Sequence, residues 1–464
     1  MNGRFWTYAA AGYLAACLLL GGASAAGAAA NALLQLAGLI LVVMLMWRRD
    51  YDFPPEAKGP LLIGAALLLV GLLSLVPLPV SLWSSLPLRD EILAGFRLMG
   101  MQPPALPLSL APPLTIASLL HLVPAAAMFL LVLHLPNDER RRLLPVVLVV
   151  AGISIVLGAF QLMGGPGSPL RLYDVTNKNS PVGFFANANH EATLLLCALP
   201  LTAVVAGRMA TRRSRSKRSG GAIISVAIAV FLIAGIAISG SSAGYGLVLP
   251  AAVASFLIYR RSVAGRLEKW WAAALALFLI LFAAAALRGP LSSEAFEADL
   301  ADQPTSRRVL AAKTIEAIDD SFPAGTGLGT FSTLYRRYED PSRVTRQYAN
   351  HAHNDYLEVA LELGIGGILL ILAFLFWWGR RSLIVWRRDL PGGALARAGS
   401  AMIGLVLAHS IVDYPIRTGA IVAVFAMACA LMVPPPAARR PAQVEEEEEE
   451  DGSPRKRARH VEAV

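Results

Sequence analysis

The sequence predicts an all-α integral membrane protein with about 12 transmembrane helices and a long, partly helical loop between spans nine and ten. Two observations carry this prediction. Hydrophobic residues make up 56% of the 464 residues and charged residues only 16%, whereas a soluble domain usually carries about 25% charged residues. The apolar residues also gather in runs of about 17 to 22, the length that crosses a hydrocarbon core of roughly 30 Å.

The apolar runs and the breakers between them place the spans along the chain, with boundaries uncertain by a few residues. The predicted spans are 5–22, 29–47, 60–76, 115–134, 143–163, 189–207, 221–238, 245–259, 271–287, 357–378, 399–413 and 417–433. The end of the first span, LLLGGASAAGA, also resembles a signal-peptide cleavage region. The charge pattern below favours a retained segment.

The basic residues predict the orientation of these spans. Most of the 41 Lys and Arg residues lie on the side that holds the N-terminus, in short segments such as RMATRRSRSKR and YRRSVAGRLEK. Because such loops stay in the cytoplasm, both termini are expected there. Topology thus explains the net charge of +9, and no nucleic-acid partner is expected. The tail 434–464 is Pro-rich, then acidic, then basic, which predicts disorder and leaves 1–433 as the membrane domain.

Polar residues gather at the non-cytoplasmic ends of several spans, where ionisable groups are costly and usually face a cavity or a partner. The candidates are His351, His353, Asn354, Asp355, Glu358 and Glu362 at the tenth span, Asn187, Asn189, His190 and Glu191 at the sixth, His409 and Asp413 at the eleventh, and the segment SGSSAGYG between the seventh and eighth. Each group also has a structural reading, as a helix cap, a solvated loop residue or a bond between helices. For His353 with Asn354 the functional reading is favoured, because the other polar ends open on the same side.

The long loop 288–356 adds a cluster of basic residues, among them Arg307, Arg308, Arg336 and Arg337. They are either solvated charges or an anion site, since guanidinium groups match phosphate oxygens. His-x-His with a nearby Asp and Glu offers metal-ligand types, but the spacing is a weak signal, and no metal ion or cofactor is expected. Arginines and a histidine at the non-cytoplasmic ends of the spans favour a phosphate-linked lipid as substrate. Its apolar chain would lie among the membrane lipids and its charged head at the polar residues.

Four motifs resemble those of the O-antigen ligase and polymerase superfamily of bacterial envelope proteins. They are G-F-F-A-N-x-N-x-x-A at 183–192, S-R followed by T-I-x-x-I-D-D-x-F-P-x-G-x-G-L-G-T-F in 306–331, A-H-N-D-Y-L-E-x-x-x-E-L-G-I-G-G at 352–367, and H-S-x-x-D-Y-P at 409–415. Their order and spacing agree with the family over roughly 180–420.

The resemblance implies a metal-independent, inverting glycosyltransferase in the bacterial inner membrane, with its active site facing the periplasm. The donor would be a glycan on undecaprenyl diphosphate, and the acceptor a sugar hydroxyl on lipid A–core or on another repeat unit. His353 would be the general base and Arg307 would stabilise the diphosphate leaving group. The other implied substrate-binding residues are Asn354, His351, Arg308, Arg336, Arg337, Asn187, Asn189 and Asp413.

One position departs from the family pattern. The family often has S-x-S-R-x-G between the seventh and eighth spans, and Ser242 stands where that arginine would be. Arg336 or Arg337 is a candidate replacement, and the departure weakens a strict ligase assignment. Three alternatives stay open: a polymerase of the same superfamily, a twelve-span transporter or lipid flippase, and an assembly factor without catalysis. The lack of a twofold internal repeat counts against the transporter.

Overall fold

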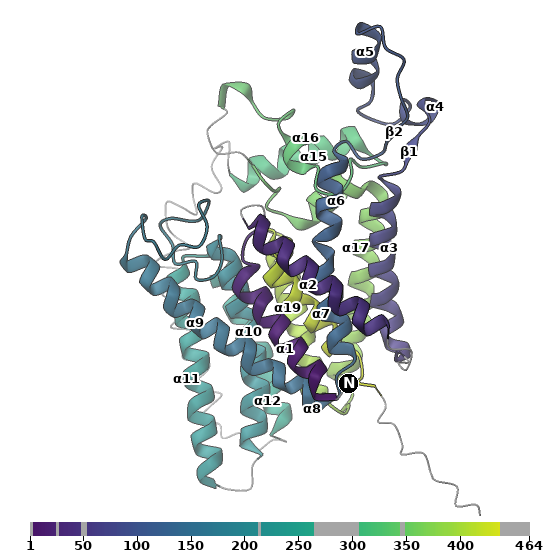
Figure 1. The fold of residues 1–464 in the computed structure, drawn as a ribbon. Helices are drawn as coiled ribbons and strands as arrows, with labels where there is room; N and C mark the ends of the chain where they lie inside the picture. The colour runs from purple at the N-terminus through teal and green to yellow at the C-terminus, as the bar shows by residue number, and fades with distance from the viewer. Residues whose placement is uncertain are drawn as a thin grey trace, which may run out of the picture.

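The computed structural model describes residues 3–24, 27–47, 53–211, 215–263, 306–343 and 349–436. Regular structure in these residues is almost entirely helical (Figure 1). The longer helices are α1 (Gly3–Leu20), α2 (Ala28–Met46), α3 (Lys58–Leu73), α5 (Asp90–Leu98), α6 (Pro112–Leu120), α7 (Leu122–Leu133), α9 (Leu144–Met163), α10 (Ala188–Ala210), α11 (Arg215–Ser239), α12 (Ser242–Ser262), α15 (Arg307–Ser321), α17 (Asp355–Arg387), α18 (Gly393–His409) and α19 (Gly419–Leu431). The short elements are α4 (Val80–Trp83), α8 (Asn137–Arg140), α16 (Phe331–Tyr335), the 3₁₀ turns η1 (Pro55–Ala57), η2 (Arg141–Leu143), η4 (Pro341–Arg343) and η5 (Pro415–Arg417), and the antiparallel pair β1 (Pro77–Leu78) and β2 (Leu106–Pro107).

Seven helices in the described part of the chain are long and apolar enough to cross a membrane. They are Ala28–Met46, Pro55–Leu73, Pro112–Leu133, Asn137–Met163, Ala188–Ala210, Ser242–Ser262 and Asp355–Arg387, and the shorter apolar helices are Arg4–Leu20, Ile223–Ser239, Gly393–His409 and Gly419–Leu431. Every predicted span within the described residues coincides with one of these helices. The predicted span 271–287, the loop residues 288–305 and the tail from 437 onward lie outside the described residues, so the total number of spans stays a prediction.

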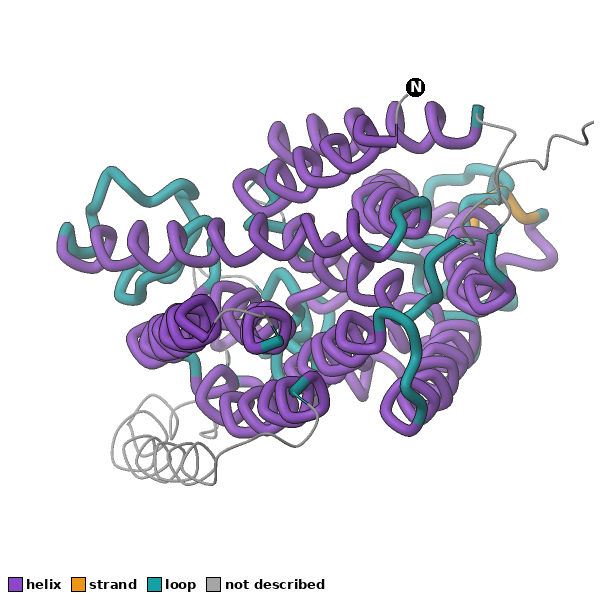
Figure 2. The backbone as a smooth tube through the Cα atoms, turned by 90° about the horizontal axis from the view of Figure 1, so that it is seen from below, coloured by secondary structure: helices purple, strands orange, loops and turns teal. Residues whose placement is uncertain are grey.

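Two helices form the centre of the bundle. Most residues of α10 are buried, and α10 packs against α9, α11, α12 and α18, while α19 packs against α1, α7 and α18. In the view from below, several helices lie side by side and are seen nearly along their axes (Figure 2). Outer helices instead expose leucines, such as Leu36 on α2 and Leu69 on α3. Apolar surface of this kind suits contact with lipid rather than water.

The first part of α17 is held by a glycine-rich turn. The helix breaks at Gly364, whose φ of 56° and ψ of −138° are not helical. The turn at 323–329 fills this break: the Gly327 amide donates to the Glu362 carbonyl at 2.7 Å, and the Ile365 amide donates to the Pro323 carbonyl at 3.0 Å. A Cβ on Gly364 would lie 2.1 Å from that Pro323 oxygen, so only glycine fits there.

This docking explains why two of the sequence motifs contain so many glycines. The turn connects α15 to α16, and both helices then pack over the beginning of α17 in one apolar cluster (Figure 1). Its buried members are Leu310, Ala317, Phe331, Leu334, Tyr335, Tyr338, Ala352 and Leu361. The cluster places the start of α15 beside the residues that precede α17.

Candidate functional site

The structure brings His353 next to Asp413. His353 lies just before α17, and Asp413 lies in the turn between α18 and α19. His353 Nδ1 and Asp413 Oδ1 are 3.0 Å apart, although the ring N–H is not well aligned with the oxygen for a full hydrogen bond. The His353 side chain is 27% exposed and Asp413 is fully buried. The Nδ1 edge of the imidazole therefore lies against a buried carboxylate, while part of the ring remains exposed.

The backbone at His353 is unusual. Its φ is 51°, in the left-handed region that non-glycine residues rarely occupy. The next residue, Asn354, caps α17: its Oδ1 accepts from the amides of Tyr356 and Leu357, and its Nδ2 donates to the Ile411 carbonyl at 2.9 Å. Both ends of the Asn354 side chain are thus engaged within the protein. This arrangement fixes the conformation of the segment that carries His353.

The ring of Tyr414 is the centre of a histidine cluster. The centroids of His190, His351 and His353 lie 5.0, 4.2 and 4.9 Å from it. Burial raises the pKa of the Tyr414 phenol above its usual value, so the ring stays neutral near neutral pH. His351 is further held by Glu358, whose Oε1 is 2.7 Å from its Nδ1. Residues from three separate motifs therefore meet around one aromatic ring.

The carboxyl group of Asp413 is placed to remain ionised. Burial alone raises its pKa, but the adjacent His353 outweighs burial, and the pKa lies well below its usual range. Its second oxygen, Oδ2, accepts from Asn187 Nδ2 at 3.4 Å. A buried carboxylate at this distance can stabilise the positive charge that an imidazole carries after it accepts a proton from a substrate.

Asn187 and Asn189 come from the beginning of α10. Asn187 is the N-cap, and its side chain accepts from the Asn189 amide at 2.9 Å while contacting Asp413. Asn189 Oδ1 accepts from Ser241 Oγ at 2.6 Å. Ser242, at the position where the family often has arginine, begins α12 directly after Ser241. The beginning of α10 therefore contacts both Asp413, through Asn187, and the N-cap of α12, through Asn189.

Arg417 was missed by sequence reasoning. It lies in η5 with 16% of its side chain exposed, and its guanidinium lies 3.4, 3.4 and 3.1 Å from carboxylate oxygens of Asp355, Glu358 and Glu362 on one face of α17. Glu362 also accepts from the Gly329 amide at 2.8 Å, which connects this network to the glycine turn. The available signal was a set of three acids at helical spacing in an apolar segment, which requires a buried cation.

Arg307 is the first residue of α15, the helix that packs beside the residues preceding α17. It shares a helix face with Leu310, three residues on, which packs in the cluster that contains Ala352. The charge of Arg307 is felt at His409, and His409 Nδ1 lies 2.9 Å from Thr193 Oγ1 on α10. The charge of Arg307 therefore reaches His409, which lies near Asp413.

The other predicted arginines are more peripheral. Arg308 is exposed on α15, and Arg336 is exposed directly after α16. Arg337 forms a two-pronged salt bridge with Glu91, at 3.0 and 2.7 Å, and so ties this loop to the projecting segment that contains α5 (Figure 1). In the structure the Arg337 guanidinium is thus engaged with α5 rather than with the residues around Tyr414.

Within the described residues, no group of three or more His, Cys, Asp or Glu side chains is arranged to hold a metal ion. The same region does contain buried polar atoms without a protein partner. These are both ring nitrogens of His190 and Nε2 of His409, close to Asp413. Buried polar atoms are usually hydrogen-bonded, so water molecules could satisfy these nitrogens.

The chain was also compared with known proteins. Residues 227–372 match the family model described as O-antigen ligase, and this match supports the O-antigen ligase superfamily. It includes Arg307, His353 and the glycine turn, whereas Asn187 and Asp413 lie outside it. A search of curated proteins gave no match. With the apolar helices, the match points to a multi-pass membrane enzyme of ligase or polymerase type that resembles a glycosyltransferase.

Proposed function

We propose that the chain transfers a glycan from undecaprenyl diphosphate to a sugar hydroxyl, with His353 as the general base. The observation that carries the proposal is the His353–Asp413 pair at 3.0 Å, in which His353 belongs to the family-matched segment and lies at the end of an apolar helix. Because Nδ1 faces the acid, Nε2 is the nitrogen directed to substrate. The described residues provide no hydrogen-bond partner for Nε2.

The reaction is a direct displacement. Nε2 of His353 takes the proton of the acceptor hydroxyl, the hydroxyl oxygen attacks the anomeric carbon, and the carbon–oxygen bond to the diphosphate breaks. The bonding electrons leave with the diphosphate, so the anomeric configuration is inverted. Asp413 stabilises the imidazolium that forms, and Arg307 stabilises the charge that develops on the leaving group. No step requires a metal ion.

The surroundings support a lipid-linked donor. The apolar surface of the outer helices provides a route for a polyprenyl chain in the bilayer, and the polar cluster lies at the ends of α10, α17 and α18 rather than along their middles. We place this face in the periplasm, as the positive-inside rule implies for the cytoplasmic termini. The acceptor is either lipid A–core, as in a ligase, or another repeat unit, as in a polymerase.

The test is glycan transfer in membranes that contain the full-length chain and a lipid-linked donor. His353→Ala should lower the transfer rate by about 100- to 10,000-fold, the usual contribution of a positioned base. The matched control is His121→Ala, because the His121 side chain bonds only to the Ala117 carbonyl in its own helix. Normal transfer by His353→Ala, at equal protein level, would refute the proposal. Attachment of glycan to lipid A–core identifies a ligase, and chain lengthening identifies a polymerase.

A further inference from the structure

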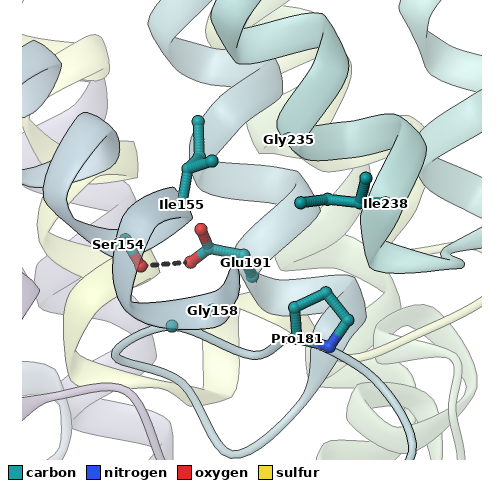
Figure 3. Close-up of a pocket in the computed structure, with 8 residues that line it drawn as sticks. Ser154, Ile155, Gly158, Pro181, Glu191, Gly235 and Ile238 are labelled. Atoms are coloured by element: carbon teal, nitrogen blue, oxygen red, sulfur yellow. Dashed lines mark hydrogen bonds between the residues drawn. The ribbon is translucent and has the colours of Figure 1, made fainter. Parts of the chain in front are cut away.

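A small cavity lies beside the first turn of α10. Its volume is about 10 Å³, near the lower limit for one water molecule, and it lies between α9, α11 and the segment before α10. Figure 3 shows the residues that line it. They are Ser154, Ile155, Gly158, Pro181, Gly183, Glu191, Gly235 and Ile238. Glu191 is the only titratable residue in this lining, and its neighbours along the wall are glycines, proline and isoleucines.

Glu191 has one bonded and one unbonded oxygen. Ser154 Oγ donates to Oε2 at 2.6 Å (Figure 3), while Oε1 is buried and has no protein partner among the described residues. No charged side chain in the described residues acts on this carboxyl group. A buried carboxylate without a cation is far more costly than a buried neutral acid. The lining supplies only three side-chain oxygens, too few to enclose a cation that prefers six to eight oxygen ligands.

The Glu191 carboxyl group is connected to the catalytic residues through Ser154. Ser154 Oγ also accepts from the Phe184 amide at 3.1 Å, so one hydroxyl joins Glu191 to the loop that leads into Asn187. A Cβ on Gly183 would lie 2.0 Å from that hydroxyl, which shows how closely the loop approaches α9. Asn187 in turn contacts Asp413.

We propose that Glu191 is a protonated, neutral acid that positions Asn187 and Asp413 through Ser154, with its proton on Oε1 facing a cavity that holds water. Its role rests on the proposed transferase function, while its protonation state does not. A neutral acid keeps the Ser154 bond and avoids the cost of a buried charge that has no cation beside it. Glu191 is therefore a positioning residue and exchanges no proton with substrate.

Infrared difference spectra of the full-length protein in lipid vesicles at neutral pH test the protonation state. Wild type minus Glu191→Gln should contain the C=O stretch of a protonated carboxylic acid. The control difference, wild type minus Glu316→Gln, should contain only carboxylate bands, because Glu316 is exposed and paired with Lys313. A carboxylate signal in the Glu191 difference would overturn the proposal, whether or not the protein transfers glycans.

Transfer rates test the positioning role. Glu191→Gln is neutral and retains an oxygen for Ser154, so the rate should stay within about threefold of wild type. Glu191→Ala removes the bond and enlarges the cavity, and it should lower the rate by about tenfold or more. Equal losses in the Gln and Ala variants would contradict the proposal, because they would indicate a residue that works as an ion. If His353→Ala retains transfer, the proposed function fails while the infrared result still decides the state of Glu191.

Discussion

The charge of Asp413 should control the rate of transfer through His353. Asp413→Asn keeps the size and shape of the side chain but removes a negative charge 3.0 Å from Nδ1. With an effective dielectric constant of about 20, that separation corresponds to a gross interaction of about 5 kcal/mol. His353 is 27% exposed, so water weakens the interaction, and we expect a net loss of about 3 kcal/mol. That loss lowers the transfer rate by about 100-fold.

The assay is single-turnover transfer from a lipid-linked glycan in proteoliposomes, with protein in excess over the donor so that all of the donor is bound. Asp138→Asn is the matched control, because Asp138 pairs with Arg141 and is 80% exposed. It should leave the rate unchanged. A rate for Asp413→Asn within about twofold of wild type would show that the carboxylate does not assist His353, and the reasoning from the 3.0 Å contact would be wrong.

Two further substitutions test how the site is held. Gly364→Ala should destabilise the protein by more than about 2 kcal/mol, because Gly364 has a φ of 56° and its Cβ would overlap the backbone of the glycine turn. The control is Gly366→Ala, because a Cβ there would have no neighbour closer than 3.6 Å, and this variant should unfold within a few degrees of wild type. An equal loss of stability in the two variants would refute the contact between the glycine turn and the break in α17. Arg417→Gln should cost about 3 to 5 kcal/mol, since it leaves buried carboxylates without their cation. The exposed Arg337→Gln should cost less than about 1 kcal/mol in the same thermal unfolding measurement, and an Arg417 variant as stable as that control would contradict the network.

The helices could be predicted because hydrophobic length alone identifies an apolar helix. A run such as 143–163 has no other stable arrangement in a bilayer, and the structure has α9 there. The convergence of separate motifs could be predicted only in part. His353 and Asp413 were both selected because each lies at the end of an apolar run on one side, but no sequence pattern gives the 3.0 Å contact between them.

The glycine turn shows a different limit. Gly325, Gly327 and Gly329 were visible as a motif, and so was Gly364, but they are far apart in sequence. Their common reason is steric: the turn and the break in α17 approach so closely that backbone amides and carbonyls bond across them. Sequence periodicity predicts single helices or strands, and it does not predict how two irregular segments pack against each other.

Arg417 shows why the charge balance of a membrane site is hard to predict. The acids of α17 invited two interpretations, as substrate groups or as bonds between helices. The structure supports the second for Glu358 and Glu362, since both lie within 3.4 Å of the Arg417 guanidinium. That arginine follows Asp413 by only four residues, so one short turn supplies both the anion beside His353 and the cation among the acids. Asp413 lies beside His353, and Arg417 lies among the acids of α17. A movement of η5 would therefore disturb both sets of contacts together. The turn between α18 and α19 therefore positions both Asp413 beside His353 and Arg417 among the acids of α17.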